Sequence, residues 1–174
     1  RAVRAQPFHA MSIGARAREL ESRGIRIAKL SLGEPSFGAP PGVHEAMRAT
    51  MDGRALPYTP AAGLPALRRA VAGLYRTRHG VDVDPRRVLI TAGASAGLLL
   101  ATALTTEAGD DVVMADPCYP CNRELVDTFG GRVVLAPTTP AARYQLDLAT
   151  ALAAWTERTS AVQVATPSNP TGTT

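Results

Sequence analysis

The sequence VLITAGASAGLLLATALTTEA, residues 88–108, has the pattern of a buried strand, a turn of small residues and a helix. Residues 88–91 are apolar and mostly β-branched, residues 92–97 are all small, and an apolar helical run follows. The first N–H groups of a helix lack intrahelical partners and, with the helix dipole, favour an anion. Gly93 allows close backbone approach and Ser95 can donate one more hydrogen bond, so the stretch predicts a phosphate-binding turn at residues 93–95.

Other interpretations of this stretch stay open. Small residues at a strand-to-helix turn often serve only to pack the helix on the sheet. Residues 91–97 also resemble the dinucleotide turn of short-chain dehydrogenases, which keeps an NAD(P)-binding oxidoreductase as an alternative, although that motif has a glycine where Leu99 stands and no G-x-G-x-x-G is present.

The composition excludes several classes of protein. The chain has 174 residues, 45% of them hydrophobic, with a formal charge of +4, and its arginines are scattered, so nucleic-acid binding is disfavoured. No apolar run reaches membrane-spanning length and no signal-peptide pattern opens the sequence. We therefore expect a soluble, cytoplasmic protein that binds neither membranes nor nucleic acid.

The two cysteines form a C-x-x-C motif, Cys118-Tyr119-Pro120-Cys121. A thioredoxin-like redox pair is one interpretation, and two cysteines lining a pocket is the one we favour. The three histidines lie far away in the sequence, so no metal site is predicted.

Apolar periodicity and turn residues predict alternating strands and helices, and hence an α/β fold with a mostly parallel sheet covered on both faces. Ligands bind such sheets beyond the carboxyl ends of the strands, so the polar turns after three strands (residues 93–95, 118–119 and 169–172) should share one crevice. The predicted strands are residues 25–32, 87–91, 111–115, 132–136 and 160–165, and the predicted helices are residues 7–24, 43–51, 66–78, 95–107, 121–129 and 148–157, the last capped by Asp147.

Five motifs in register resemble the pyridoxal-phosphate-dependent aminotransferases of fold type I, class I/II, over nearly the whole chain. The motifs are LSLGEP (30–35), YTPAAGLPALR (58–68), GAS (93–95), GDDVV with DPCYP (109–113 and 116–120), and SNPTG (168–172). The resemblance implies a three-layer α/β/α large domain, incomplete here, that starts near residue 39. Residues 1–38 would then form a helix and strand belonging to the small domain.

The resemblance also implies roles for single residues. Gly93, Ala94 and Ser95 match the residues that hold the phosphate of pyridoxal 5'-phosphate, and Tyr119 matches the aromatic that stacks on its ring. Asn169 matches the asparagine that hydrogen-bonds the phenolic oxygen of the cofactor and borders the substrate.

Two further matches concern the first part of the chain. Tyr58 matches a tyrosine that reaches the phosphate in the neighbouring subunit, which implies a homodimer. Gly33 matches a glycine beside the substrate carboxylate.

The implied activity is transfer of an amino group between an amino acid and a 2-oxo acid, as part of amino acid biosynthesis or metabolism. The family's Schiff-base lysine, pyridinium aspartate and carboxylate-binding arginine find no match before Thr174, and the single lysine, Lys29, falls in a predicted edge strand. No catalytic residue is therefore assigned, and we expect the 174-residue chain alone to be inactive. A lyase of the same fold and a non-catalytic ligand-binding domain remain alternatives.

Overall fold

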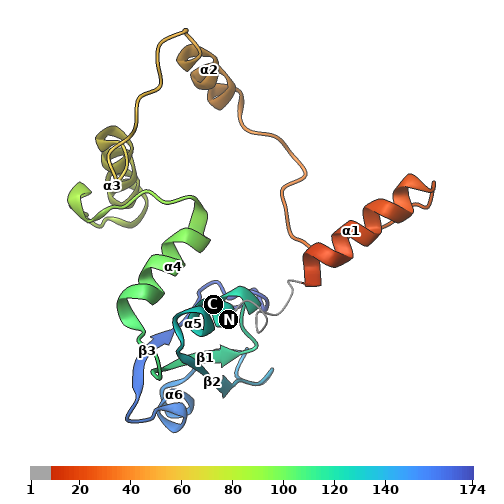
Figure 1. The fold of residues 1–174 in the computed structure, drawn as a ribbon, viewed down its shortest axis with the longest axis vertical. Helices are drawn as coiled ribbons and strands as arrows, with labels where there is room; N and C mark the ends of the chain where they lie inside the picture. Colours follow the sequence, from red (N-terminus) through yellow and green to blue (C-terminus); the bar gives the residue numbers. More distant parts are fainter. Residues whose placement is uncertain (1–8) are drawn as a thin grey trace. The chain divides into compact units, whose positions relative to one another are not determined.

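The computed structural model describes residues 9–174, which form helices joined to one parallel sheet (Figure 1). The chain divides into two units, Ala10–Thr91 and one made chiefly of Ala92–Thr174. The first unit contains α1 (His9–Ser22), α2 (Pro41–Thr50), α3 (Pro65–His79) and a 3-10 turn, η2 (Pro85–Arg87). The second contains α4 (Gly93–Thr105), β1 (Asp111–Asp116), α5 (Pro120–Phe129), β2 (Arg132–Pro137), α6 (Leu148–Ala154) and β3 (Thr159–Gln163).

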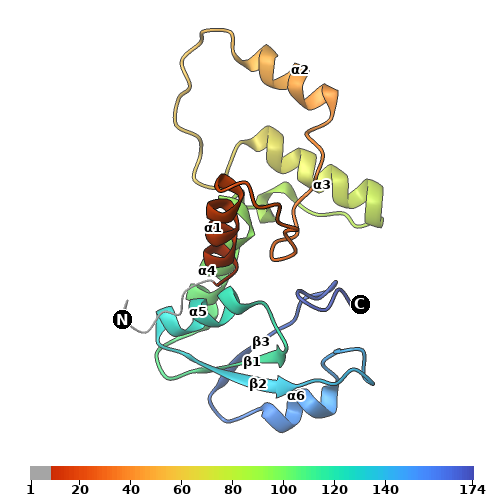
Figure 2. The same cartoon turned by 90° about the vertical axis from the view of Figure 1, so that its right-hand side faces the viewer.

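The sheet has the order β2-β1-β3, and both pairings are parallel, as the sequence predicts. After β1 the chain crosses to one side through α5, and after β2 it returns across β1 through α6. Because such crossovers share one handedness, opposite directions of travel place the two helices on opposite faces. Figure 2 shows this arrangement, with α5 on one face of the sheet and α6 on the other.

The centre of the sheet holds the core of the second unit. Val112, Val113 and Met114 of β1 are almost fully buried, as expected of a central strand covered on both faces. Val126 of α5 packs against Val112 and Met114, and Cys118 and Val133 lie against the same cluster. This packing fixes where the chain leaves the carboxyl end of β1.

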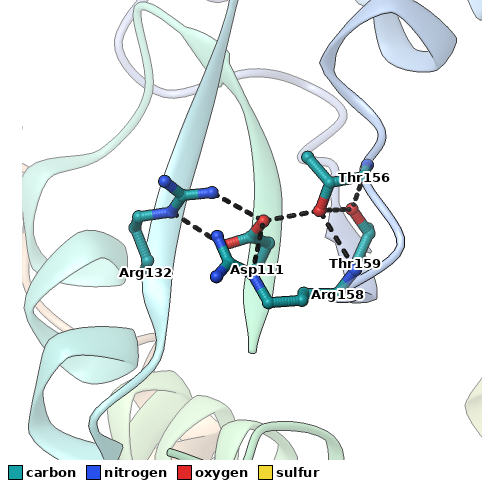
Figure 3. A network of polar contacts seen from close by, with 5 residues as sticks. All are labelled: Asp111, Arg132, Thr156, Arg158 and Thr159. Atoms are coloured by element: carbon teal, nitrogen blue, oxygen red, sulfur yellow. Dashed lines mark hydrogen bonds and ion pairs between the residues drawn. The ribbon is translucent and has the colours of Figure 1, made fainter. Parts of the chain in front are cut away.

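The buried carboxylate of Asp111 connects the amino-terminal ends of the three strands (Figure 3). Asp111 at the start of β1 has no exposed surface, and both of its oxygens accept hydrogen bonds from Arg132, Nε at 2.8 Å and Nη2 at 2.7 Å. The Thr156 hydroxyl, just before β3, donates to the same carboxylate at 2.6 Å. These bonds hold the pKa of Asp111 well below its usual range, the Arg132 bond being the largest cause.

Two predicted strands do not form. Residues 25–32 are irregular, and residues 88–91 follow η2 without joining a sheet. A β-rich run becomes a strand only when a neighbour completes its ladder, and here the N–H of Ile90 donates to Ala62, a loop residue. Lys29 is accordingly not on an edge strand, and its ammonium pairs with Glu21 of α1 at 2.8 Å.

The helices agree better with the sequence pattern. Gly24 ends α1 with φ +82°, and Asp147 caps α6 by accepting a hydrogen bond from the N–H of Thr150 at 2.7 Å. The predicted helix over residues 148–157 is shorter in the structure and stops at Ala154. The predicted start of the first helix at Pro7 lies outside the described residues, and the domain boundary near residue 39 stays a prediction.

Candidate functional site

A cavity of about 300 Å³ opens at the carboxyl ends of β1 and β3. The chain goes from β1 to β2 on one side and then passes back to β3 on the other side of β1. Open α/β sheets bind ligands beyond the carboxyl ends of the strands at such a change of direction. The lining residues come from the end of β1, the start of α5, the loop before α6 and the turn after β3; they are Met114, Ala115, Pro117, Cys118, Tyr119, Asn122, Tyr144, Gln145, Leu146, Gln163, Val164, Ala165, Thr166, Ser168 and Asn169. Two of the three predicted polar turns therefore meet here.

Tyr119 enters the cavity wall from the N-cap of α5. Pro120 follows as the first helical residue, where its missing N–H costs no helical hydrogen bond. The Tyr119 side chain is half-buried, and hydrogen bonding with the Cys121 thiol, together with burial, raises its pKa. The hydroxyl of Tyr119 is thus hydrogen-bonded to a neighbour on the same helix turn.

Asn122 is a member of this wall that the sequence analysis missed. It lies three residues after Tyr119, on the first turn of α5, and is only 9% exposed. Its Oδ1 is fully buried and has no hydrogen-bond partner among the described residues. An unpaired buried acceptor is costly, so this atom marks a place where a donor is expected. The helical spacing from Tyr119 was the available signal.

Asn169 is held by a closed turn after β3. The N–H of Ser168 donates to Thr173 and the N–H of Gly172 donates to Ser168, at 2.9 and 2.7 Å. The Gln145 side chain, from the loop before α6, anchors this turn by donating to the Thr173 hydroxyl at 2.9 Å. Asn169 itself is exposed and lines the cavity, so its amide is available to a ligand.

The predicted phosphate-binding turn has the expected local form but lies outside the cavity wall. Gly93 has φ +78° and begins α4, and Ala94 and Ser95 are exposed in the first turn. None of the three is among the residues lining the cavity. The meeting of this turn with the other two in one crevice therefore stays a prediction.

Tyr58 and Gly33 belong to the first unit. Tyr58 lies in the loop before α3 and is fully exposed, and Gly33 lies in the irregular segment after α1. The cavity belongs to the other unit, and the roles assigned to these two residues remain predictions.

Arg123 connects the C-x-x-C motif with β1. Its Nε donates to the sulfur of Cys118 at 3.3 Å, and its Nη2 lies 3.4 Å from the carboxylate of Asp116. The bond to Cys118 is the largest cause that raises the pKa of Arg123. Cys118 and Cys121 are both half-buried and not joined in a disulfide.

We also searched the described part of the chain for a metal site and for a membrane-spanning helix. Residues 9–174 contain no cluster of three or more histidine, cysteine or acidic side chains placed to hold a metal ion. No helix within the same residues is long and apolar enough to cross a membrane.

A family model described as "Aminotransferase class I and II" matches residues 25–174. The chain belongs to this family. The aminotransferase relatives include a valine–pyruvate aminotransferase of Mycobacterium tuberculosis, 42% identical over 96% of this chain, and an aspartate/prephenate aminotransferase of Thermus thermophilus, 34% identical over the same share. The chain spans about 43% of the length of each.

Solved aminotransferase structures have the same fold over this region. A crystal structure of an aminotransferase from Mycobacterium tuberculosis superposes with a TM-score of 0.90 at 39% identity, over 97% of this chain and 43% of that one. The aspartate aminotransferase of Thermus thermophilus, solved with maleate, gives 0.89 at 33% identity, over 95% and 43%. The three-layer fold expected from the sequence is that of these aminotransferases.

Proposed function

We propose that this chain supplies part of the pyridoxal 5'-phosphate site of an enzyme that transfers an amino group between an amino acid and a 2-oxo acid. The observation that carries the proposal is that Tyr119, Asn122 and Asn169 line one cavity beyond the sheet of an aminotransferase-family chain. An aromatic face, an unpaired buried acceptor and an exposed amide form a donor and acceptor set suited to a polar aromatic ligand.

The residues of the cavity fit pyridoxal phosphate in their chemistry. The Tyr119 ring offers a face for a pyridine ring. The amide N–H of Asn169 can donate to a phenolic oxygen, and the unpaired Oδ1 of Asn122 can accept from a ring N–H or from a side chain that partners it. The start of α4 provides the N–H groups and the Ser95 hydroxyl for a phosphate dianion.

Each group of this chain has a binding or orienting task in that proposal. Tyr119 fixes the plane of the cofactor ring, Asn169 orients it through one edge, and the start of α4 holds its charge. The bound cofactor supplies the electron sink for the reaction. We assign proton transfer to no residue of this chain, since its one lysine, Lys29, is engaged with Glu21.

The proposed protein is a homodimer located in the cytoplasm. The fully exposed Tyr58 supports a homodimer in which this side chain reaches the neighbouring subunit. The two unpaired cysteines are consistent with a reducing, cytoplasmic setting. A role in amino acid metabolism is supported by the names of the relatives, which mention valine, aspartate and prephenate.

The test is a cofactor titration of the complete protein that carries this chain. We expect pyridoxal phosphate to bind with a new visible absorption band and NADH not to bind. Asn169→Ala should weaken pyridoxal phosphate binding by about tenfold, the loss of one hydrogen bond to a charged oxygen. Binding of NADH with no pyridoxal phosphate band would overturn the proposal in favour of an oxidoreductase. Release of an unsaturated product without amino-group transfer would favour a lyase.

A further inference from the structure

The C-x-x-C motif remains unexplained by the proposed cofactor site. Cys118 lies two residues before α5, outside the helical hydrogen bonding, and Cys121 lies in its first turn. Tyr119 and Pro120 separate them, with proline at the first helical position. A cysteine pair at a helix N-terminus is the arrangement in which thiolates are stabilised and disulfides form reversibly.

The guanidinium of Arg123 faces the sulfur of Cys118. Arg123 donates to the Cys118 sulfur at 3.3 Å, and it shares its guanidinium with Asp116. A guanidinium N–H at this distance can donate to the sulfur while it acts as the nucleophile in thiol–disulfide exchange. Cys118 also lines the 300 Å³ cavity, so a small molecule can reach it, whereas Cys121 is not part of that wall.

We propose that Cys118 and Cys121 are a redox-active dithiol that exchanges with low-molecular-weight disulfides, with Cys118 as the attacking and Cys121 as the resolving cysteine. The Cys118 thiolate attacks one sulfur of the small disulfide, whose S–S bond breaks and releases one thiolate. The Cys121 thiolate then attacks the Cys118 sulfur, and the second small thiolate leaves. The protein loses two electrons and two protons, and the small disulfide is reduced to two thiols.

Formation of the internal disulfide requires a movement of Cys118. Side chains three apart in a helix have Cβ atoms about 5–6 Å apart, whereas a disulfide needs about 3.5–4.5 Å. Cys118 has to move by the difference, and it stands before the N-cap residue rather than within the helix. The proposal concerns the thiols alone and holds whether or not the cavity binds pyridoxal phosphate.

The experiment equilibrates the complete protein in buffers of increasing oxidised-to-reduced glutathione, blocks free thiols, and analyses the tryptic peptide of residues 88–123. That peptide contains both cysteines of the chain. We expect it to lose the mass of two hydrogen atoms reversibly as the ratio rises. A peptide that stays reduced at every ratio, or that carries only glutathione without the internal bond, overturns the proposal.

Further variants separate the roles of the two cysteines and of Arg123. Cys121→Ser should stop at a glutathione adduct on Cys118, and Cys118→Ser should form little adduct on Cys121. An adduct on Cys121 in Cys118→Ser with none on Cys118 in Cys121→Ser would overturn the assigned order. Arg123→Leu should slow alkylation of Cys118 by iodoacetamide about tenfold, while Arg48→Leu, which removes an exposed arginine of α2, should not. Equal alkylation rates in all three proteins, each shown to be folded by circular dichroism, would contradict the role of Arg123.

Discussion

Two buried polar side chains, Asp111 and Asn122, meet their hydrogen-bonding needs in opposite ways. Asp111 uses both oxygens within the fold, through Arg132 and Thr156. Asn122 leaves its Oδ1 unpaired at a cavity wall. A satisfied buried group stabilises the structure and an unsatisfied one costs stability until a ligand or another chain segment pairs with it. The first is therefore a structural residue, and the second is one that we propose for binding.

Asp111→Asn should lower the melting temperature at pH 7 by roughly 5 °C or more, because Arg132 then faces a neutral group. The folded-state pKa of Asp111 is lowered, so its contribution is present above the unfolded value of about 3.9 and is lost as pH falls through the folded value. Wild-type stability should thus fall more steeply below pH 4 than that of the variant, and thermal melts over pH 2–7 measure this.

Asp84→Asn is the matched control. The pKa of Asp84 is lowered to about 2, chiefly by the side-chain hydrogen bond of Arg86, but this ion pair is exposed. Exposed pairs contribute little, so a shift of less than about 2 °C is expected. Equal shifts for the two variants would contradict the structural role given to Asp111.

Ser95→Ala should weaken pyridoxal phosphate binding to the complete protein by about one to two orders of magnitude, with the fold intact. The reason is the loss of one charge-assisted hydrogen bond to phosphate, worth roughly 1.5–3 kcal/mol. Titration by absorbance gives the affinity. Ser160→Ala, which alters an exposed serine of β3, serves as the control. An unchanged affinity for Ser95→Ala would mean that this serine only packs the turn.

At the scale of elements, the sequence predicts those helix bounds and strands that depend on the local hydrophobic pattern and on capping residues. The helix bounds follow from prolines at the first turns of α2, α3 and α5 and from glycines after α3 and α5. The strands of the sheet follow from apolar runs that find neighbours. Residues 25–32 and 88–91 have similar runs, but strand formation depends on a partner elsewhere in the chain, which composition does not reveal. Asn122 was missed for the same reason, since the burial of its Oδ1 at the cavity wall depends on residues elsewhere in the chain.

The turn before α3 contains a glycine that the structure requires. Gly63 has φ +94°, and a Cβ there would overlap the side chain of Ile90, within 2.5 Å of its Cβ. Gly63→Ala should therefore destabilise the protein by about 2 kcal/mol or more. Gly73→Ala, in the open middle of α3, should instead stabilise it by roughly 0.5–1 kcal/mol. Urea unfolding measures both, and two changes of the same sign would contradict this geometry.

At the scale of the whole molecule, the described residues expose many large apolar side chains. The exposed fractions of Leu30, Leu56 and Tyr58 are 94%, 91% and 104%. Those of Phe37 and Met51 are 80% and 82%. Surfaces of this kind are covered in stable proteins by other chain segments or by partners.

The 174-residue chain, produced by itself, should consequently self-associate. Light scattering during size-exclusion chromatography should give a mass above the 18.2 kDa of one chain, falling toward it in a Leu30→Gln, Leu56→Gln variant. A uniform monomer of the unaltered chain at micromolar concentration would contradict the prediction.

Incubation of the same chain with pyridoxal phosphate, followed by borohydride and peptide mapping, should give no stoichiometric adduct on Lys29.

The position of β1 between β2 and β3 also sets the order of events during synthesis. The register pairs Asp111 with Arg132 on one side and with Thr159 on the other, so the second partner is translated much later. At about 5–20 residues per second, roughly 2–10 s pass on the ribosome before Thr159 follows Asp111. Throughout that interval one edge of an apolar strand presents unpaired N–H and C=O groups to other nascent chains. The length of the α5–β2–α6 connection therefore fixes how long that edge stays unpaired.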